Sequence, residues 1–251
     1  MPSSEPGPVP VIFLPGIMMP VALRYEPLLR VLGVDVRSVL KELEVYRGPE
    51  IPPAGYSFMS ELDAIARTAD EAEFETFHIY GHSGGGACAL AFTALHPERV
   101  RSLAVDEPAV DFSAEDLREL REVQVPMADL PPEELMPAFV RAQVREDLEP
   151  PPPPNGPPPW MSERPAGVAA FVRALAEADV PIERLESFGR PAYYSYGSLS
   201  SVSWERRAER LSRLLPNLTV ERFEGLSHLN TSHVAEPDRV ASALRRLWGL
   251  A

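Results

Sequence analysis

The segment Gly81-His82-Ser83-Gly84-Gly85 has the form G-x-S-x-G, a pattern that can present a serine hydroxyl as a nucleophile. An apolar run at residues 76–80 precedes it, and a helix-forming run at residues 87–96 follows it. A strand that turns sharply into a helix would project Ser83 into a cleft, and glycine at 81 and 85 would avoid clashes with neighbouring backbone. The N–H of Gly84, at the start of the helix, could donate to a developing oxyanion.

A phosphate-binding loop is the main alternative for a glycine-rich turn between a strand and a helix. Such a loop would need a Walker lysine, which this segment lacks, and G-x-G-x-x-G is also absent. The turn could also be a plain connection with no chemistry. The strand before it and the helix directly after it favour a nucleophile.

A serine is a weak nucleophile at neutral pH unless a base within hydrogen-bond reach, itself oriented by a third group, activates it. Three histidines suit structural roles: one lies in a predicted strand, one is the variable position of the turn, and one ends a helix (His78, His82 and His96). The other two, His228 and His233, share the segment 223–233 after the last predicted strand.

Short apolar runs alternate with longer amphipathic runs, which predicts an α/β fold with a mostly parallel sheet of about six strands flanked by helices. The predicted strands are residues 9–14, 34–40, 76–80, 101–106, 192–196 and 218–223. The predicted helices are residues 25–32, 57–74, 87–96, 113–123, 132–147, 164–177, 204–215 and 237–248.

The alternation stops between residues 111 and 188, where no convincing strand is found. We therefore expect a core made of residues 1–110 and 189–251, with a helical insertion at 111–188. Within the insertion, the proline-rich segment 150–159 predicts extended polyproline II structure, because proline fixes φ and removes an amide donor.

Composition restricts the partners. The chain has 251 residues, 37 acidic against 24 basic side chains and a net charge of -13, which disfavours nucleic acid and anionic membrane surfaces. The single cysteine, Cys88, excludes an intramolecular disulfide. No signal peptide and no apolar run long enough for a membrane span are found, so a cytoplasmic location is expected. The 29 prolines fall largely in loops, which they would stiffen.

With the serine turn in this context, the chain resembles the α/β-hydrolase family over its whole core. The resemblance implies that the helical insertion is a cap over the nucleophile. It also implies a second oxyanion donor after the first inner strand, in residues 13–18 (FLPGIM). Pro15 replaces the usual histidine there, but Gly16 is kept. The N–H of Ile17 is then the expected second donor, with Met18 next.

The resemblance also assigns the base and the acid. Gly225-Leu226-Ser227-His228 is similar to the family's G-x-x-H loop and favours His228 over His233. At the family's commonest position for the acid, residues 196–201 (YGSLSS) carry Ser200, which cannot offset an imidazolium charge. Some branches carry the acid after the strand that follows the serine helix. Here that segment, LAVDEP at 103–108, makes Glu107 the expected acid and Asp106 the alternative.

These residues predict a serine hydrolase that cleaves an ester, thioester or related acyl bond of a small-molecule substrate, with no cofactor and no metal. An acyltransferase with the same three residues, or a non-catalytic binding protein of this fold, are the alternatives. The latter is motivated by Pro15 and Ser200. The natural substrate and the oligomeric state are not specified by the sequence.

Overall fold

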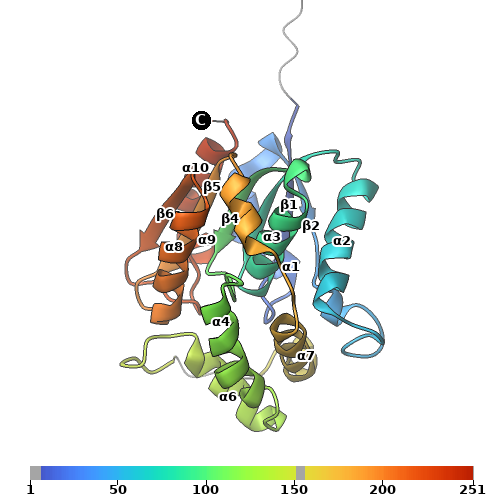
Figure 1. Cartoon of the computed structure of the whole chain (residues 1–251), viewed down its shortest axis with the longest axis vertical. Coiled ribbons are helices and arrows are strands. Elements are labelled where there is room, and N and C mark those ends of the chain that lie inside the picture. Colours follow the sequence, from blue (N-terminus) through green and yellow to red (C-terminus); the bar gives the residue numbers. More distant parts are fainter. Residues whose placement is uncertain (1–6, 151–155, 251) are drawn as a thin grey trace, which may run out of the picture.

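Six parallel strands form a single sheet in the order β2-β1-β3-β4-β5-β6 (Figure 1). This computed structural model describes residues 7–150 and 156–250. The strands are β1 (Val9–Leu14), β2 (Val36–Leu40), β3 (Phe77–His82), β4 (Val100–Asp106), β5 (Ala192–Gly197) and β6 (Leu218–Phe223). Every residue of β3 and β5 is buried, as expected for inner strands of a parallel sheet covered on both faces. The predicted α/β class and the six strands are confirmed.

Helices cover both faces of this sheet. One face packs against α1 (Val21–Leu32), α9 (Ser232–Ala235) and α10 (Pro237–Leu247), and the other against α2 (Phe58–Glu71), α3 (Gly84–Leu95) and α8 (Val202–Leu214). The α3 helix, GGGACALAFTAL, is buried from Gly84 to Ala94 because it lies at the centre of the sheet. It therefore fixes the residue that precedes it, Ser83, against the core.

A helical segment, residues 111–188, lies between β4 and β5. Its α-helices group at one end of the sheet (Figure 1), whereas its 3₁₀ turn at residues 182–187 packs against α3. It contains α4 (Ala114–Glu119), α5 (Val125–Met127), α6 (Pro132–Ala142) and α7 (Arg164–Ala176). Its described residues include no strand, only an isolated antiparallel bridge between Val144 and Ser200. Residues 151–155 of the proline-rich segment lie outside the described residues, so the polyproline II expectation stays a prediction there.

Several element boundaries differ from the predictions. Helix α6 ends at Ala142 rather than residue 147, because Arg145 N–H donates to Leu199 O and the chain pairs there with the loop after β5. Helix α1 begins at Val21, directly after Pro20, rather than at residue 25. Strand β2 begins at Val36 rather than at residue 34, because residues 33–35 form a 3₁₀ turn.

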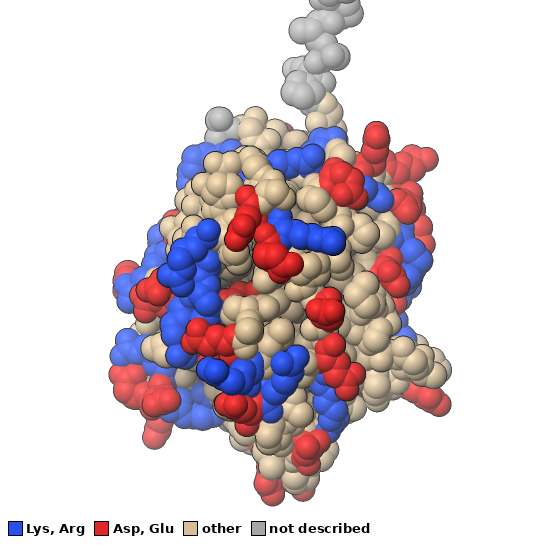
Figure 2. Space-filling model, viewed as in Figure 1, with Lys and Arg blue, Asp and Glu red and all other residues tan. Residues whose placement is uncertain are grey.

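The surface carries charges of both signs. Lys and Arg side chains are interspersed with Asp and Glu over the face shown in Figure 2. Among the described residues, each helix is too short or too polar to cross a lipid bilayer.

Candidate active site

Ser83 occupies a strained turn between β3 and α3, with φ of 52° and ψ of -117°. Close packing explains the glycines around it. A Cβ at Gly81 would lie 2.2 Å from the Gly85 carbonyl oxygen, and one at Gly85 would lie 2.5 Å from the carbonyl oxygens of Leu14 and Pro15. A backbone hydrogen bond to the end of β4 also fixes the turn, because Ser83 N–H donates to Asp106 O at 3.0 Å. The sequence pattern therefore has the steric basis expected of it.

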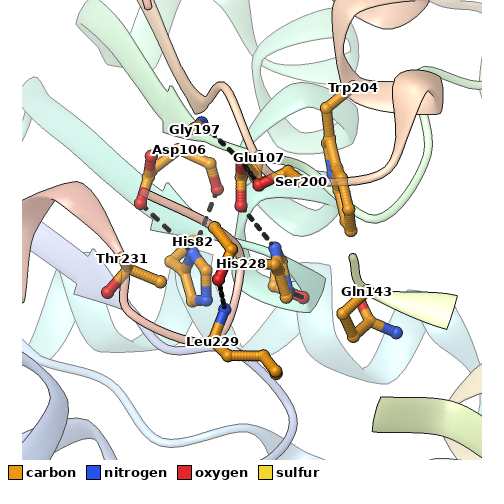
Figure 3. A network of polar contacts seen from close by, with 12 residues as sticks. His82, Asp106, Glu107, Gln143, Gly197, Ser200, Trp204, His228, Leu229 and Thr231 are labelled. Atoms are coloured by element: carbon orange, nitrogen blue, oxygen red, sulfur yellow. Dashed lines mark hydrogen bonds and ion pairs between the residues drawn. The ribbon is translucent and has the colours of Figure 1, made fainter. Parts of the chain in front are cut away.

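Three of the predicted residues form one chain of hydrogen bonds. Ser83 Oγ lies 3.0 Å from His228 Nε2. His228 Nδ1 lies 2.7 Å from Glu107 Oε2, a contact that Figure 3 shows. His228 comes from the loop after β6, and Glu107 directly follows β4. All three residues are buried, with exposed fractions of 6% for Ser83, 7% for His228 and 2% for Glu107. Residues 145 positions apart in the sequence are thus brought into contact.

Strand alternation explains why Glu107, and not Asp106, reaches His228. Successive side chains of a strand point to opposite faces of the sheet. Leu103 and Val105 of β4 pack on the face of α3 and α8, whereas Ala104 packs on the face of α1 and α10. Glu107 continues the first set and Asp106 the second. Figure 3 shows the two carboxylates directed to different histidines.

Ser200 contacts the acid rather than the imidazole. Its hydroxyl donates to Glu107 Oε1, and Gly197 N–H donates to the same oxygen at 2.8 Å. Each carboxylate oxygen of Glu107 therefore has its own partners: Oε2 faces His228, and Oε1 faces the loop after β5. No such role was predicted for Ser200. A signal was present, since Ser200 occupies the position at which the family resemblance places the acid.

Trp204, from α8, is a further residue that sequence reasoning missed. Its ring stacks on His228 with centroids 4.4 Å apart and an interplanar angle of 11°, and its Nε1–H donates to Pro108 O at 3.1 Å. The stacked ring and the carboxylate together fix the plane and position of the imidazole. Because no motif marks this tryptophan, only the three-dimensional structure identifies its contact.

Asp106 lies at the centre of a second buried network. Its Oδ1 accepts from Ser195 Oγ at 2.7 Å and from Ser232 Oγ at 3.1 Å, while Oδ2 lies 2.9 Å from His233 Nδ1 and 3.4 Å from His82 Nδ1. The register pairs His82 with Asp106, and Asp106 with Ser195, so the network runs across three adjacent strands.

Burial and hydrogen bonding together set the charges of Asp106, His82 and His233 in this network. Burial alone would raise the pKa of Asp106, but hydrogen bonds from His233 and His82 outweigh it and lower that pKa. Burial lowers the pKa of both histidines, despite the opposing hydrogen bonds with Asp106. The result is one carboxylate between two neutral imidazoles.

Asp106, His82 and His233 have the spacing of a possible metal site, since one ligand atom from each lies within 4.8 Å of the others. However, both Nδ1 atoms face Asp106 at hydrogen-bonding or near hydrogen-bonding distance. A nitrogen that donates a hydrogen cannot also donate its lone pair to a cation. The hydrogen-bond network accounts for all three residues.

The two predicted oxyanion donors lie near each other beside Ser83. A Cβ at Gly84 would lie 3.8 Å from Ile17 N, and neither Ile17 N–H nor Gly84 N–H has an acceptor among the described residues. The loop that carries Ile17 is fixed, because Gly85 N–H donates to Pro15 O at 2.9 Å and Tyr46 Oη donates to Ile17 O at 2.8 Å. Glycine is required at position 16, because an added Cβ would lie 2.8 Å from His82 Cδ2.

Two cavities meet at Ser83. The first, the Phe171 cavity, has a volume of about 340 Å³ and extends beneath α7, past Gly84, Phe171 and Trp204. The second, the Arg24 cavity, has a volume of about 500 Å³ and includes His228, Arg24 and Met19. Both cavities are lined by Ile17, Ser83, Phe139 and Gln143, so a substrate bound at Ser83 has space on two sides.

Comparison with known proteins identifies the class to which this fold and site belong. A sequence model described as alpha/beta hydrolase fold matches residues 46–230, most of the chain. The chain therefore belongs to the α/β-hydrolase family, as its resemblance implied. No match was found among curated proteins.

Solved structures support the same fold. A malate-bound thermophilic esterase from Thermogutta terrifontis is 18% identical, with a TM-score of 0.72 over 97% of this chain and 90% of that one. The 2-hydroxy-6-oxo-6-phenylhexa-2,4-dienoate hydrolase from Rhodococcus is 17% identical, with a TM-score of 0.69 over 96% and 90%. A haloalkane dehalogenase loop variant from Bradyrhizobium elkanii is 15% identical, with a TM-score of 0.66 over 97% and 90%.

Proposed function

We propose that this protein is a serine hydrolase that cleaves an ester, thioester or related acyl bond of a small molecule through an acyl-enzyme intermediate. The observation that carries the proposal is the hydrogen-bond chain from Glu107 through His228 to Ser83, with distances of 2.7 Å and 3.0 Å. An esterase and a 2-hydroxy-6-oxo-6-phenylhexa-2,4-dienoate hydrolase among the similar structures are consistent with hydrolytic chemistry on this fold.

Each residue of the chain has a defined role in the proposed reaction. His228 Nε2 accepts the hydroxyl proton while Ser83 Oγ attacks the acyl carbon. Glu107 accepts a hydrogen bond from His228 Nδ1–H and stabilises the imidazolium that forms. His228 then returns the proton to the leaving oxygen, and a water activated by the same imidazole releases the acid.

The oxyanion of the tetrahedral intermediate would bind between Gly84 N–H and Ile17 N–H. These two amides suit the role because they lie beside Ser83 and have no acceptor among the described residues. Each pre-positioned donor would stabilise the transition state by roughly 3 kcal/mol. The fixed loop around Gly16 keeps Ile17 in place, so little reorganisation is needed during the reaction.

The helical segment 111–188 acts, in this proposal, as a cap that shapes the substrate site. Phe139 of α6 and Phe171 of α7 line the cavities at Ser83, which supports this role. A cap that limits bulk water strengthens the electrostatic interactions of the site. We expect the size of the accepted acyl group to depend on residues of α6 and α7.

Covalent labelling tests the proposal directly. A fluorophosphonate should modify folded protein once, at Ser83, and Ser83→Ala should not be labelled. Hydrolysis rates for para-nitrophenyl esters of increasing acyl length should be measured in parallel, with Ser83→Ala as the control. Absence of both an adduct and Ser83-dependent hydrolysis would favour a non-catalytic member of the fold.

Acyl transfer to an alcohol is the second candidate. The observation that bears on it is the burial of Ser83 and His228, because restricted access of water lets an alcohol compete for an acyl-enzyme. The ratio of ester product to acid product, measured with added short alcohols, separates the two activities. Acid alone at high alcohol concentration would identify a hydrolase.

A further inference from the structure

Arg24 is a buried cation that has no ion-pair partner among the described residues. It lies on α1 with an exposed fraction of 8%. Its Nη1 donates to Thr231 Oγ1 at 3.2 Å, while its buried Nε has no hydrogen-bond partner. Arg207, which is similarly buried, is paired with the Asp116 carboxylate, whose Oδ2 lies 2.8 Å from Arg207 Nε. Because burying an unpaired guanidinium is costly, the position of Arg24 calls for a partner of opposite charge.

Arg24 lines the same cavity as the proposed nucleophile and base. The other lining residues are mainly apolar: Ile17, Met18, Met19, Phe139, Val140, Pro158, Trp160, Met161 and Leu229. The polar ones besides Arg24 are Ser83, His82, Gln143 and His228. Among the described lining residues, Arg24 therefore contributes the one permanently charged side chain. A volume of about 500 Å³ is suited to a small ligand.

Asp106 is the acidic group in the neighbourhood, but it forms no ion pair with Arg24. It acts on the guanidinium at a distance, without an ion pair. Both Asp106 oxygens already accept hydrogen bonds, from Ser195, Ser232 and His233. Arg24 Nη2 thus has no acceptor among the described residues, and is available to a ligand in the cavity.

We propose that Arg24 is a substrate-binding residue that recognises a carboxylate on the ester substrate, whose apolar part fills the remainder of the Arg24 cavity. This inference rests on the proposed function, since Ser83 defines which bond is cleaved. A guanidinium suits a carboxylate because its planar N–H groups match the two oxygens, and the interaction is strongest where water is excluded. The preferred substrates would be esters with an apolar body and one anionic end.

Two pairs of esters that differ by one carboxylate test the inference. The carboxylate lies on the acyl side in the pair para-nitrophenyl valerate and mono-para-nitrophenyl glutarate. It lies on the leaving group in the pair phenyl acetate and para-carboxyphenyl acetate. In at least one pair, Arg24→Gln should lower kcat/KM for the anionic ester roughly 10- to 100-fold more than for the neutral ester, chiefly through KM. Arg24→Lys should retain part of the preference.

Arg30→Gln is the matched control. It removes the same charge from the same helix, but its side chain is 75% exposed and paired with Glu26. The ratio of anionic to neutral ester rates should be unchanged in this variant. If Arg24→Gln lowered both rates equally, together with the melting temperature, Arg24 would be only a counter-charge for Asp106. That result, or an unchanged ratio in both pairs, overturns the inference.

A binding measurement separates this inference from the proposed activity. Glutarate should raise the melting temperature of Ser83→Ala, and the additional change Arg24→Gln should remove that shift. If the wild type showed no esterase activity while the glutarate shift of Ser83→Ala still depended on Arg24, the proposed function would be contradicted and the carboxylate site retained. Active protein without any glutarate effect and without ester discrimination would contradict the site alone.

Discussion

Ser200 and Glu107 share a hydrogen bond across two neighbouring strand ends. The Ser200 hydroxyl donates to Glu107 Oε1, and the other carboxylate oxygen faces His228 Nδ1 at 2.7 Å. The position at which the family resemblance places the acid is thus joined directly to Glu107. Ser200 does not replace a carboxylate; it orients one that comes from β4.

Glu107→Gln should lower kcat by about 10⁴-fold with little change in stability. The amide is nearly the same size, but it presents a hydrogen donor to His228 or fixes the wrong imidazole tautomer. Steady-state hydrolysis of a para-nitrophenyl ester measures the effect. A loss smaller than tenfold would show that Glu107 is not the acid.

Ser200→Ala should lower kcat by roughly tenfold. The variant removes one of two donors to Glu107 Oε1 and leaves the Gly197 N–H in place at 2.8 Å. A loss of one charge-assisted hydrogen bond is expected to weaken orientation of the carboxylate rather than remove its charge. The double variant with Glu107→Gln tests the coupling, because Ser200→Ala should then have almost no additional effect.

Asp106→Asn should mainly reduce stability, by about 3 kcal/mol, because it places an amide among buried groups arranged around a carboxylate. Unfolding in urea measures this change. The comparison with Glu107→Gln separates the two adjacent acids: one variant should lose mostly stability, the other mostly kcat. The reverse pattern would make Asp106 the acid.

Gly16→Ala should lower kcat by roughly 10²-fold without abolishing folding. The new methyl would lie 2.8 Å from His82 Cδ2 and 3.1 Å from Ser83 Cβ, so the loop that carries Ile17 N–H must move. Loss of one oxyanion donor has an effect of about this size. Gly189→Ala is the control, because no atom lies within 4 Å of its added Cβ.

His78 should make the free energy of unfolding depend on pH. Burial, aided by the charge of Arg101, lowers the pKa of His78 from 6.5 to about 4. Because the native pKa is the lower one, the stabilisation is complete above about pH 6.5. It is lost progressively as the pH falls toward 4, by up to about 3 kcal/mol.

Urea unfolding of wild type and His78→Gln at pH 7 and pH 5 isolates this contribution, since other acid-sensitive groups are common to both proteins. Wild type should lose more stability than the variant between these two pH values. An equal loss in both would assign the pH dependence to other groups.

Much of the fold was predictable because strand and helix periods differ clearly in the core. The segments at residues 9–14 and 218–223 were located with the right ends, and Ser83 was recognised from its glycines. The end of α6 was not, because residues 144 and 145 pair with the loop after β5, a tertiary contact that local propensity does not encode.

The same limit applies to the site. Asp106 and Glu107 are adjacent in sequence, and the choice between them depended on which face of the sheet each side chain occupies. Trp204 carries no local signal of its stacking on His228. Arg24 lies about 200 positions from Thr231, its hydrogen-bond partner. These relationships arise from the packing of distant elements rather than from short motifs.

The contact between Ser200 and Glu107 affects how members of this fold family are compared. The carboxylate beside His228 lies where the ends of two neighbouring strands meet, since Glu107 follows β4 and its partner Ser200 lies in the loop after β5. A search that aligns residues strand by strand would therefore report no acid after β5, although Glu107, which follows the neighbouring strand β4, contacts His228.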